Sequence, residues 1–235
     1  MDMAVLARLN HLRLNRRPVV EVINLTSGVS TLVTAQDDLR DEVGLAAMSA
    51  MAGGVSVTET INSEAYVFNV HRPPTRLIII GAVHISQALA PMAATVGMDV
   101  SIVDPRNAFA TDERFPGAKI FAMWPDEAFE QVSPDADTAI VAITHDPKID
   151  DPAIEVALDR GCFYVGALGS KRTHGSRLTR LKDKGYSEQV LERIRAPIGL
   201  DIGARQPAEI AVAILAELIA YRQSAVRSLE HVRQS

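Results

Sequence analysis

The apolar residues of the chain follow two different patterns, which meet at Arg72-Pro73-Pro74. Before this point, short apolar stretches alternate with turns and amphipathic segments, which predicts a small mixed α/β domain. Its expected elements are a helix at 4–14, strands at 19–25 and 31–34, a helix from an Asp37 or Asp38 cap to about 51, and strands at 55–58 and 65–70. Because consecutive prolines hold the backbone extended, we place a boundary there and predict an N-terminal domain over residues 1–73.

After the linker the pattern changes to apolar strands that alternate with helices at the spacing of βαβ units. The predicted strands lie at 77–80, 99–103, 119–121, 138–143 and 162–166. Helices are expected at 85–96 and at 151–160, the second with Asp151 as its cap and Pro152 at its first position. Near-continuous apolar strands are typical of parallel sheets that are buried on both faces. The predicted fold class is therefore α/β, with a Rossmann-like parallel sheet and helices on both faces.

Three further helices are expected beyond Gly169, at about 171–182, 187–195 and 207–222. The first is the most basic stretch of the chain, and the last has an apolar stripe at helical spacing that is most simply core. We therefore place the Rossmann-like domain at residues 74–225 and a tail at 226–235.

Charge and composition narrow the function classes. The 235 residues include 24 Lys and Arg against 29 Asp and Glu, a net charge of −5, so any anion site has to be local. No segment approaches the roughly 20 apolar residues of a membrane span, and the first residues have no signal-peptide cleavage pattern. We therefore expect a cytoplasmic protein that binds neither nucleic acid nor membranes.

The single cysteine, Cys162, excludes an intrachain disulfide and a cysteine-clustered zinc or iron–sulfur site. Its apolar neighbours predict a buried strand, in which a thiol behaves as a small hydrophobe. A reactive or sulfur-carrying thiol is the alternative interpretation.

A glycine turn, Gly81-Ala82-Val83-His84-Ile85-Ser86, follows the first strand of the Rossmann-like domain. A strand, a glycine turn and a helix start place backbone N–H groups and the positive helix end against an anion. Gly81 keeps the tight turn, but Val83 and Ser86 stand where the G-x-G-x-x-G pattern has its second and third glycines. Val83 is expected to project a branched side chain into the pyrophosphate space, which argues against ordinary NAD binding.

Three polar residues accompany this turn. His84 begins the helix and can donate to an anionic ligand, or pack locally. Asp104 ends the second strand, where a carboxylate can accept hydroxyls of a nucleotide or pterin, or form a turn before Pro105. Arg106 can clamp a phosphate bidentately, or form a surface ion pair.

Thr144-His145-Asp146 directly follows the fourth strand. These residues are expected at the carboxyl edge of the sheet, where open α/β proteins bind ligands. His145 beside Asp146 can serve acid–base chemistry or hold a polar ligand, although Asp146-Pro147 can also simply begin a turn. No serine or cysteine partners His145 in a recognisable motif, so a hydrolase is not favoured.

A second possible anion cradle follows the fifth strand, with Gly169, Ser170 and Arg172 as candidate ligand contacts. The other basic residues of this stretch, which include Arg177 and Arg180, are expected to face solvent or a partner protein. Asp201 lies in a glycine-containing loop that can line the ligand site or reverse the chain.

These motifs together resemble the XdhC/CoxI family, from about Arg76 to Arg222. The resemblance rests on the glycine turn and on the order of the following segments: Val103-Asp104-Pro105-Arg106, Glu113-Arg114-Phe115-Pro116, Thr144-His145-Asp146, Tyr164-Val165-Gly166-Ala167-Leu168-Gly169-Ser170 and Gly199-Leu200-Asp201-Ile202-Gly203-Ala204. Two departures stand out: the turn lacks two glycines that many relatives have, and no glycine-rich segment with a cysteine is found around Gly53-Gly54. The N-terminal domain is therefore expected to be divergent.

The resemblance implies an accessory protein for molybdenum hydroxylases such as xanthine dehydrogenase. Such a protein is expected to be a chaperone without catalytic residues or a metal site of its own. Its cargo would be the molybdenum cofactor, molybdopterin, which it protects while a cysteine desulfurase supplies sulfur and which it then passes to the apoenzyme. The resemblance also implies a homodimer. The alternatives are an NAD(P)-dependent oxidoreductase of Rossmann type and a scaffold that only docks partner proteins.

Overall fold

The computed structural model describes residues 2–232 and separates the chain into two compact units. One unit holds the chain up to Pro73 together with the described residues from Gln223 on, and the other is Pro74–Arg222. Among the described residues, no helix combines the length and the apolar character that a membrane crossing requires.

The N-terminal unit is a four-stranded antiparallel sheet with strand order β2-β1-β4-β3. Its elements are α1 (Met3–Leu14), β1 (Val19–Asn24), β2 (Ser30–Val33), α2 (Glu42–Gly53), β3 (Val57–Ile61) and β4 (Glu64–His71). Successive residues of β1 point to opposite faces of the sheet, so Val20 packs in the core with α2 while Val19 packs with Leu9 and Leu12 of α1. This unit is the small α/β arrangement that the sequence predicted.

The start of α2 differs from the prediction. Asp41 caps this helix and accepts a hydrogen bond from the amide of Gly44 at 2.7 Å, whereas Asp37 or Asp38 was expected to do so. Asp37 instead accepts the amide and the hydroxyl of Thr34 at 2.7 and 2.8 Å, closing the turn after β2. A short polar side chain favours caps and turns alike, so the sequence does not tell which of the nearby aspartates does which.

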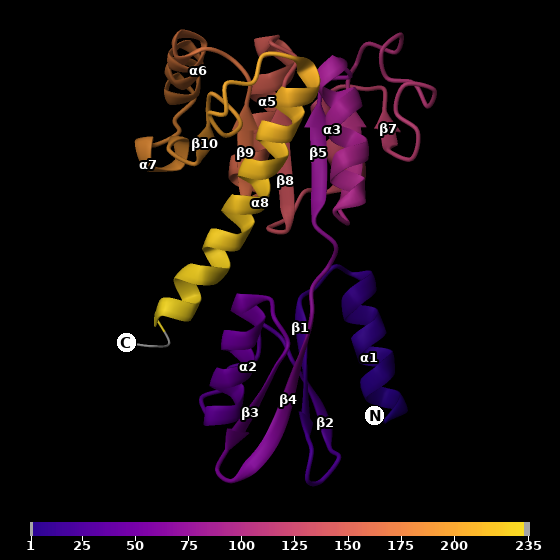
Figure 1. Cartoon of the computed structure of the whole chain (residues 1–235), viewed down its shortest axis with the longest axis vertical. Helices are drawn as coiled ribbons and strands as arrows, with labels where there is room; N and C mark the ends of the chain where they lie inside the picture. The colour runs from indigo at the N-terminus through magenta and orange to yellow at the C-terminus, as the bar shows by residue number, and fades with distance from the viewer. Residues whose placement is uncertain (1, 233–235) are drawn as a thin grey trace. The chain divides into compact units, whose positions relative to one another are not determined.

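The second unit is a six-stranded parallel sheet with strand order β10-β9-β8-β5-β6-β7. Its strands are β5 (Arg76–Ile80), β6 (Asp99–Val103), β7 (Lys119–Phe121), β8 (Thr138–Ala142), β9 (Tyr164–Ala167) and β10 (Ile194–Arg195). Counted along the chain from β5, this is the order 3-2-1-4-5-6 of doubly wound nucleotide-binding folds. Figure 1 shows β5 and β8 side by side in the middle of the sheet.

Helices cover both faces of this sheet, as predicted. They are α3 (His84–Thr95), α4 (Pro125–Val132), α5 (Pro147–Asp159), α6 (Lys171–Asp183), α7 (Glu188–Leu191) and α8 (Pro207–Val232). Along β5, Leu77 and Ile79 belong to a core with α3 and α8, while Ile78 and Ile80 belong to a second core with α4, α5 and α6. All four side chains are fully buried, so β5 carries the centre of both cores.

Several predicted boundaries in this unit were wrong. The helix predicted at 187–195 is the short α7 followed by β10, because Ile194 and Arg195 pair with Val165 and Gly166 of β9. A two-residue edge strand leaves no periodic signal of its own. Helix α4 was not predicted. Helix α8 continues past the end of this unit to Val232, so residues 226–232 are helical where a tail was expected; 233–235 lie outside the described residues.

The helix after β8 also begins earlier than predicted. Asp146 caps α5 by accepting the amide of Lys148 at 2.9 Å, and Pro147 is the first helical residue. Asp151, the predicted cap, lies inside the helix and is buried.

Cys162 lies just before β9 and is fully buried, which confirms the structural interpretation. Burial raises the pKa of its thiol to about 12, so the thiolate that a nucleophile needs is scarce at neutral pH.

Candidate functional site

The candidate residues gather at the carboxyl edge of the parallel sheet. The turns after β5 and β8 meet where the strand order reverses, between the first and fourth strands of the unit. This topological switch point is the place where doubly wound sheets bind ligands. The turn after β6 carries Asp104 and Arg106, and the turn after β9 carries Gly169, Ser170 and Arg172.

The turn between β5 and α3 depends on glycine at its first position. Gly81 has a φ of +117°, and a Cβ there would lie 2.9 Å from Cγ2 and 3.2 Å from the backbone nitrogen of Thr144. A side chain at this position would therefore both strain the backbone and push apart the turns after β5 and β8. The tight turn predicted for Gly81 is confirmed.

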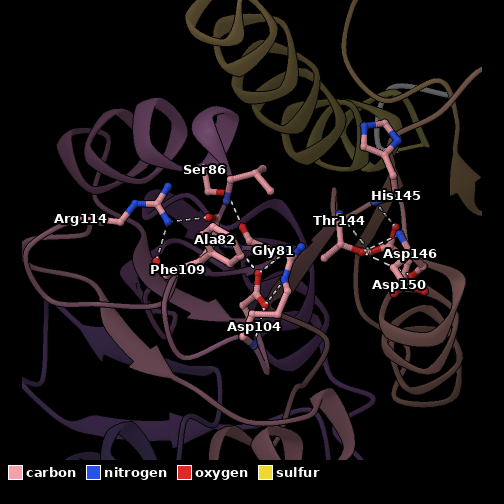
Figure 2. Close-up of polar contacts among 12 residues, drawn as sticks. Gly81, Ala82, Ser86, Asp104, Phe109, Arg114, Thr144, His145, Asp146 and Asp150 are labelled. Atoms are coloured by element: carbon pink, nitrogen blue, oxygen red, sulfur yellow. Dashed lines mark hydrogen bonds and ion pairs between the residues drawn. The ribbon is translucent and has the colours of Figure 1, made fainter.

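The first amides of this turn are used within the protein (Figure 2). The Ala82 amide donates to Oδ2 of Asp104 at 2.7 Å, and the Val83 amide donates to Oγ of Ser86 at 3.0 Å. The Ser86 hydroxyl in turn donates to the carbonyl oxygen of Gly81. Ser86, which stands in place of the third glycine, is thus a fully buried cross-link of the turn.

These bonds change the reason why the turn does not suit a pyrophosphate. Val83 was expected to block the space, but it is half-buried and packs against the core with Ile85. The obstacle is that the Ala82 and Val83 amides already have acceptors. The amides of His84 and Ile85 have no acceptor within residues 2–232, and the His84 side chain is exposed. The positive end of α3 is therefore open to an anion at His84.

Asp104 has a different set of partners from the predicted one. It was expected to accept hydroxyls of a ligand, yet it is fully buried and holds the turn of Ala82 and the side chain of Arg106. Arg106 donates to it through Nε at 2.8 Å, through one terminal nitrogen at 2.7 Å and through the backbone amide at 2.9 Å. Burial alone would raise the pKa of Asp104, but the hydrogen bonds from Arg106 and Ala82 outweigh it and hold the pKa below its ordinary value.

The side chain of Arg106 is 41% exposed. Hydrogen bonding to Asp104 raises its pKa, and the negative charges of Asp146 and Asp150 across the switch point add to the effect. Arg106 is therefore fixed by one carboxylate while part of its charge stays accessible to a ligand.

Arg114, from the Glu113-Arg114-Phe115-Pro116 motif, also contacts the turn after β5, although it was not among the predicted site residues. It donates to the carbonyl oxygens of Ala82 at 3.1 Å and Phe109 at 2.8 Å, and to Oε1 of Gln87 at 3.1 Å. Its guanidinium also lies 5.7 Å from the ring centre of Phe109, and that of Arg106 lies 5.0 Å from the same ring. The long connection between β6 and β7 is thereby fastened onto the turn after β5.

The turn after β8 is organised by a buried carboxylate that was not predicted. Asp150 accepts the hydroxyl of Thr144 at 2.7 Å, the amide of Thr144 at 3.2 Å and the amide of His145 at 3.1 Å. Burial raises the pKa of Asp150 despite these bonds and despite the positive charge of Arg177. His145 has a φ of +67°, and Figure 2 shows its imidazole turned away from Asp150. The side chain of His145 is therefore presented to solvent, while Asp146 serves as a helix cap.

The turn after β9 has the predicted layout. Gly169 has a φ of +136°, Ser170 caps α6 by accepting the amide of Thr173 at 3.2 Å, and Arg172 is exposed. Arg177 was expected to face solvent or a partner, and this was wrong: its side chain is only 3% exposed. Arg180 is ion-paired with Asp151 through two hydrogen bonds of 2.6 and 3.1 Å.

Asp201 is exposed in the loop between β10 and α8. This loop is anchored by Glu217 of α8, which accepts the Gly199 amide at 2.9 Å and the hydroxyl of Tyr164 on β9. Burial, and then the hydrogen bond to Glu217, raises the pKa of Tyr164, so its phenol keeps its proton. The loop therefore has a fixed base from which Asp201 projects.

Comparison with known proteins agrees with this architecture. The chain is 35% identical over 151 residues to the "Molybdenum cofactor insertion chaperone PaoD" of Escherichia coli, a match that covers 64% of this chain and 41% of that protein. It is 32% identical over 152 residues to a probable xanthine dehydrogenase component of Bacillus subtilis, covering 64% and 44%. The chain thus spans less than half the length of these relatives.

A solved structure extends the likeness to nearly the whole chain. The crystal structure of a xanthine dehydrogenase from Bacillus halodurans matches 93% of this chain and 64% of that one, with a TM-score of 0.67 and 23% identity. At this identity the match supports the fold. The family model described as the XdhC Rossmann domain matches residues 77–218, and this chain belongs to that family.

Proposed function

We propose that this protein binds the molybdenum cofactor and assists its insertion into a molybdenum hydroxylase of the xanthine dehydrogenase or CO dehydrogenase type. The observation that carries the proposal is the pair of helix starts at one sheet edge, α3 after β5 and α6 after β9, each accompanied by a partly or fully exposed arginine. Such an edge suits an extended anionic ligand, and the pterin of the cofactor is phosphorylated. The names of the relatives support the same function.

Some residues of the proposed site would contact the ligand, and others hold those residues in place. We assign ligand contacts to His84, Arg106, Thr144, His145, Asp146, Gly169, Ser170, Arg172 and Asp201, which are exposed or partly exposed. Gly81, Ala82 and Val83 shape the turn, because their amides are already bonded within the protein. Asp104 is not assigned as a contact, because both of its oxygens already accept hydrogen bonds. It positions Ala82 and Arg106 instead. The cofactor would supply its molybdenum chemistry to the hydroxylase, and this chain would hold and shield it.

The finer steps of the proposal come from the family resemblance. They are protection of the cofactor during its sulfuration by a cysteine desulfurase, transfer to the apoenzyme as a homodimer, and action in the cytoplasm. No residue of this chain is assigned to catalysis or to a metal of its own.

Retention of the cofactor on gel filtration tests the proposal. Purified protein mixed with molybdopterin is expected to elute with it, and Arg106→Ala and Arg172→Ala are expected to retain less, because each removes a cation from the sheet edge. Arg40→Ala is the matched control, since Arg40 is an exposed arginine of the N-terminal unit. If the wild type retains no molybdopterin and the hydroxylase matures normally without this protein, the proposal is wrong.

An NAD(P)-binding oxidoreductase is the second candidate, favoured by the 3-2-1-4-5-6 strand order. The engaged amides of Ala82 and Val83 argue against it. Titration of wild type and Val83→Gly with NADH, followed by nucleotide fluorescence, separates the two functions. We expect weak binding by the wild type. Tight binding that the substitution leaves unchanged would favour the oxidoreductase.

A further inference from the structure

Arg177 is a buried cation whose hydrogen bonds are incomplete. Its side chain is 3% exposed, yet Nε and one terminal nitrogen have no hydrogen-bond partner. The other terminal nitrogen donates to the carbonyl oxygen of Leu168 at 3.2 Å. Buried donors without acceptors are costly, and a charged group is costlier than a neutral one, so such a residue calls for an explanation.

The two neighbouring carboxylates do not complete Arg177. Oδ1 of Asp151 lies 3.6 Å from Nε of Arg177, beyond hydrogen-bonding distance, and both Asp151 oxygens accept from Arg180. Asp150 contributes an attractive charge, but its oxygens accept from Thr144 and His145. Asp151 is therefore an ion-pair partner of Arg177, while Nε and one terminal nitrogen keep unused donor capacity.

The hydrogen bond to Leu168 shows that the guanidinium of Arg177 reaches the turn before α6. A side chain in a helix leans toward the helix start, and Arg177 reaches back along α6 to Leu168, directly before Gly169 and the Ser170 cap. His174, one turn earlier on the same face, has a buried Nδ1 without a partner. Burial lowers the pKa of His174, and the charge of Arg177 adds to this, so its neutral ring can offer an N–H. Two residues with orphaned nitrogens, His174 and Arg177, thus lie within the first two turns of α6.

The turn itself offers further donors. The amides of Lys171 and Arg172 have no acceptor within the described chain, whereas those of Thr173 and His174 are bonded to Ser170. The positive end of a 13-residue helix and a buried guanidinium therefore act on the same few residues.

We propose that the turn between β9 and α6 is a phosphate-binding subsite in which Arg177, with His174, supplies the buried donors. The ligand chemistry is a phosphate monoester, which offers three oxygens to a guanidinium and to helix amides. Binding exchanges the contact between Arg177 and the Leu168 carbonyl for contacts with phosphate, as the turn at Gly169 lifts. The subsite deepens the proposed function, because it would take the phosphate end of the pterin.

Inorganic phosphate tests the subsite on the wild-type chain. In proton–nitrogen correlation spectra of arginine side chains, assigned through bonds, the Nε–H resonance of Arg177 is expected to shift saturably as phosphate is added. Chloride at equal ionic strength is the control, since it reproduces screening without three directed oxygens. An Arg177 resonance that stays in place while those of exposed arginines move would overturn the proposal. So would the absence of any phosphate binding.

A variant gives an independent measure. Arg177→Met keeps a long apolar side chain, and Asp151 stays paired with Arg180, so the buried carboxylate is not orphaned. Its affinity for phosphate is expected to fall about tenfold or more, as for the loss of a charge-assisted contact. Lys182→Met removes an exposed cation of the same helix and is expected to bind as the wild type does. Equal affinity of wild type and Arg177→Met would overturn the proposal.

The source of the phosphate is distinguished by direct titration. Molybdopterin and AMP are each titrated into the phosphate-free protein, and the ligand whose phosphate the subsite takes is expected to shift the Arg177 resonance as inorganic phosphate does. Retention of molybdopterin by Arg177→Met at wild-type affinity would refute the subsite while the proposed function stands. A phosphate-responsive Arg177 in a protein that never retains molybdopterin would leave the subsite in place and refute the proposed function.

Discussion

The turns after β5 and β9 share a layout of glycine, helix start and nearby arginine. They differ in how many of their hydrogen-bond donors have acceptors within the protein. After β5, Asp104 and Ser86 satisfy the first amides from within the protein. After β9, the cap Ser170 satisfies one amide, and the buried Arg177 is left with free nitrogens. The contrast teaches that the same motif can have its first amides bonded to its own side chains at one strand, while at another a buried guanidinium keeps unused donors.

The largest expected effects are the losses of unfolding free energy when the glycine of either turn is replaced by alanine. Gly81→Ala is expected to lower the free energy of unfolding by about 4 kcal/mol, because backbone strain is added to a clash with the Thr144 backbone. Gly169→Ala should cost about 2 kcal/mol, since a Cβ there meets only the side chain of Thr173, at 3.1 Å. Urea unfolding followed by fluorescence of Trp124, the single tryptophan, reports on this unit. Equal costs would contradict the comparison.

The next largest loss of stability is expected at Asp104, the buried carboxylate that holds the turn after β5. Asp104→Ala removes the acceptor of Ala82 and the partner of Arg106, so a loss of about 3 kcal/mol is expected in the same assay. Glu113→Ala, at an exposed position of the following connection, is the control and should change little. A loss below that of a single exposed ion pair would mean that the turn does not depend on Asp104.

Smaller losses of stability are expected when the serines of the two turns, Ser86 and Ser170, are replaced by alanine. Ser86→Ala leaves the Val83 amide and the Gly81 carbonyl without their partner and should cost about 2 kcal/mol. Ser170→Ala removes an exposed helix cap and should cost about 1 kcal/mol. A larger cost at Ser170 than at Ser86 would show that the second turn is the more closed of the two.

The smallest expected effect is a difference in pH dependence between two buried carboxylates. The pKa of Asp104 lies below its ordinary 3.8, so its contribution to stability is full above the pKa of the unfolded chain and is lost as pH falls through the folded value. The stability gap between wild type and Asp104→Asn should therefore narrow between pH 7 and pH 3. The pKa of Asp150 is raised, so the gap to Asp150→Asn should change in the opposite direction. Urea titrations at both pH values measure the two slopes, and slopes of the same sign would be inconsistent with these shifts.

Much of the Rossmann unit could be predicted from its sequence, because buried parallel strands are nearly continuous apolar runs. β5, with Leu77, Ile78, Ile79 and Ile80 all buried, is the clearest case. Periodicity does not reveal Ile194–Arg195, whose two residues become a strand only by pairing with β9. It also does not choose between nearby caps such as Asp146 and Asp151, since that choice is made by tertiary packing.

The location of the candidate residues at the carboxyl edge of the sheet could be predicted, but their hydrogen bonds could not. The turns that follow β5, β8 and β9 were identified from glycine and polar residues after apolar strands. That Asp104 would bond to Ala82, or Arg114 to the same residue from 32 positions away, depends on how distant segments meet. The burial of Arg177 could not be predicted for the same reason. A run of basic residues in a helix predicts a solvated face, whereas the packing of α6 on α5 buries this side chain.

The carboxylate of Glu217 has an implication for how relatives vary. It is shared by the Tyr164 hydroxyl and the Gly199 amide, so one side chain joins a strand, a loop and a helix. Loss of that carboxylate would leave a phenol and an amide without their common acceptor. Positions 164 and 217 should therefore covary in an alignment of homologues, with phenylalanine at 164 appearing where the acceptor at 217 has been lost.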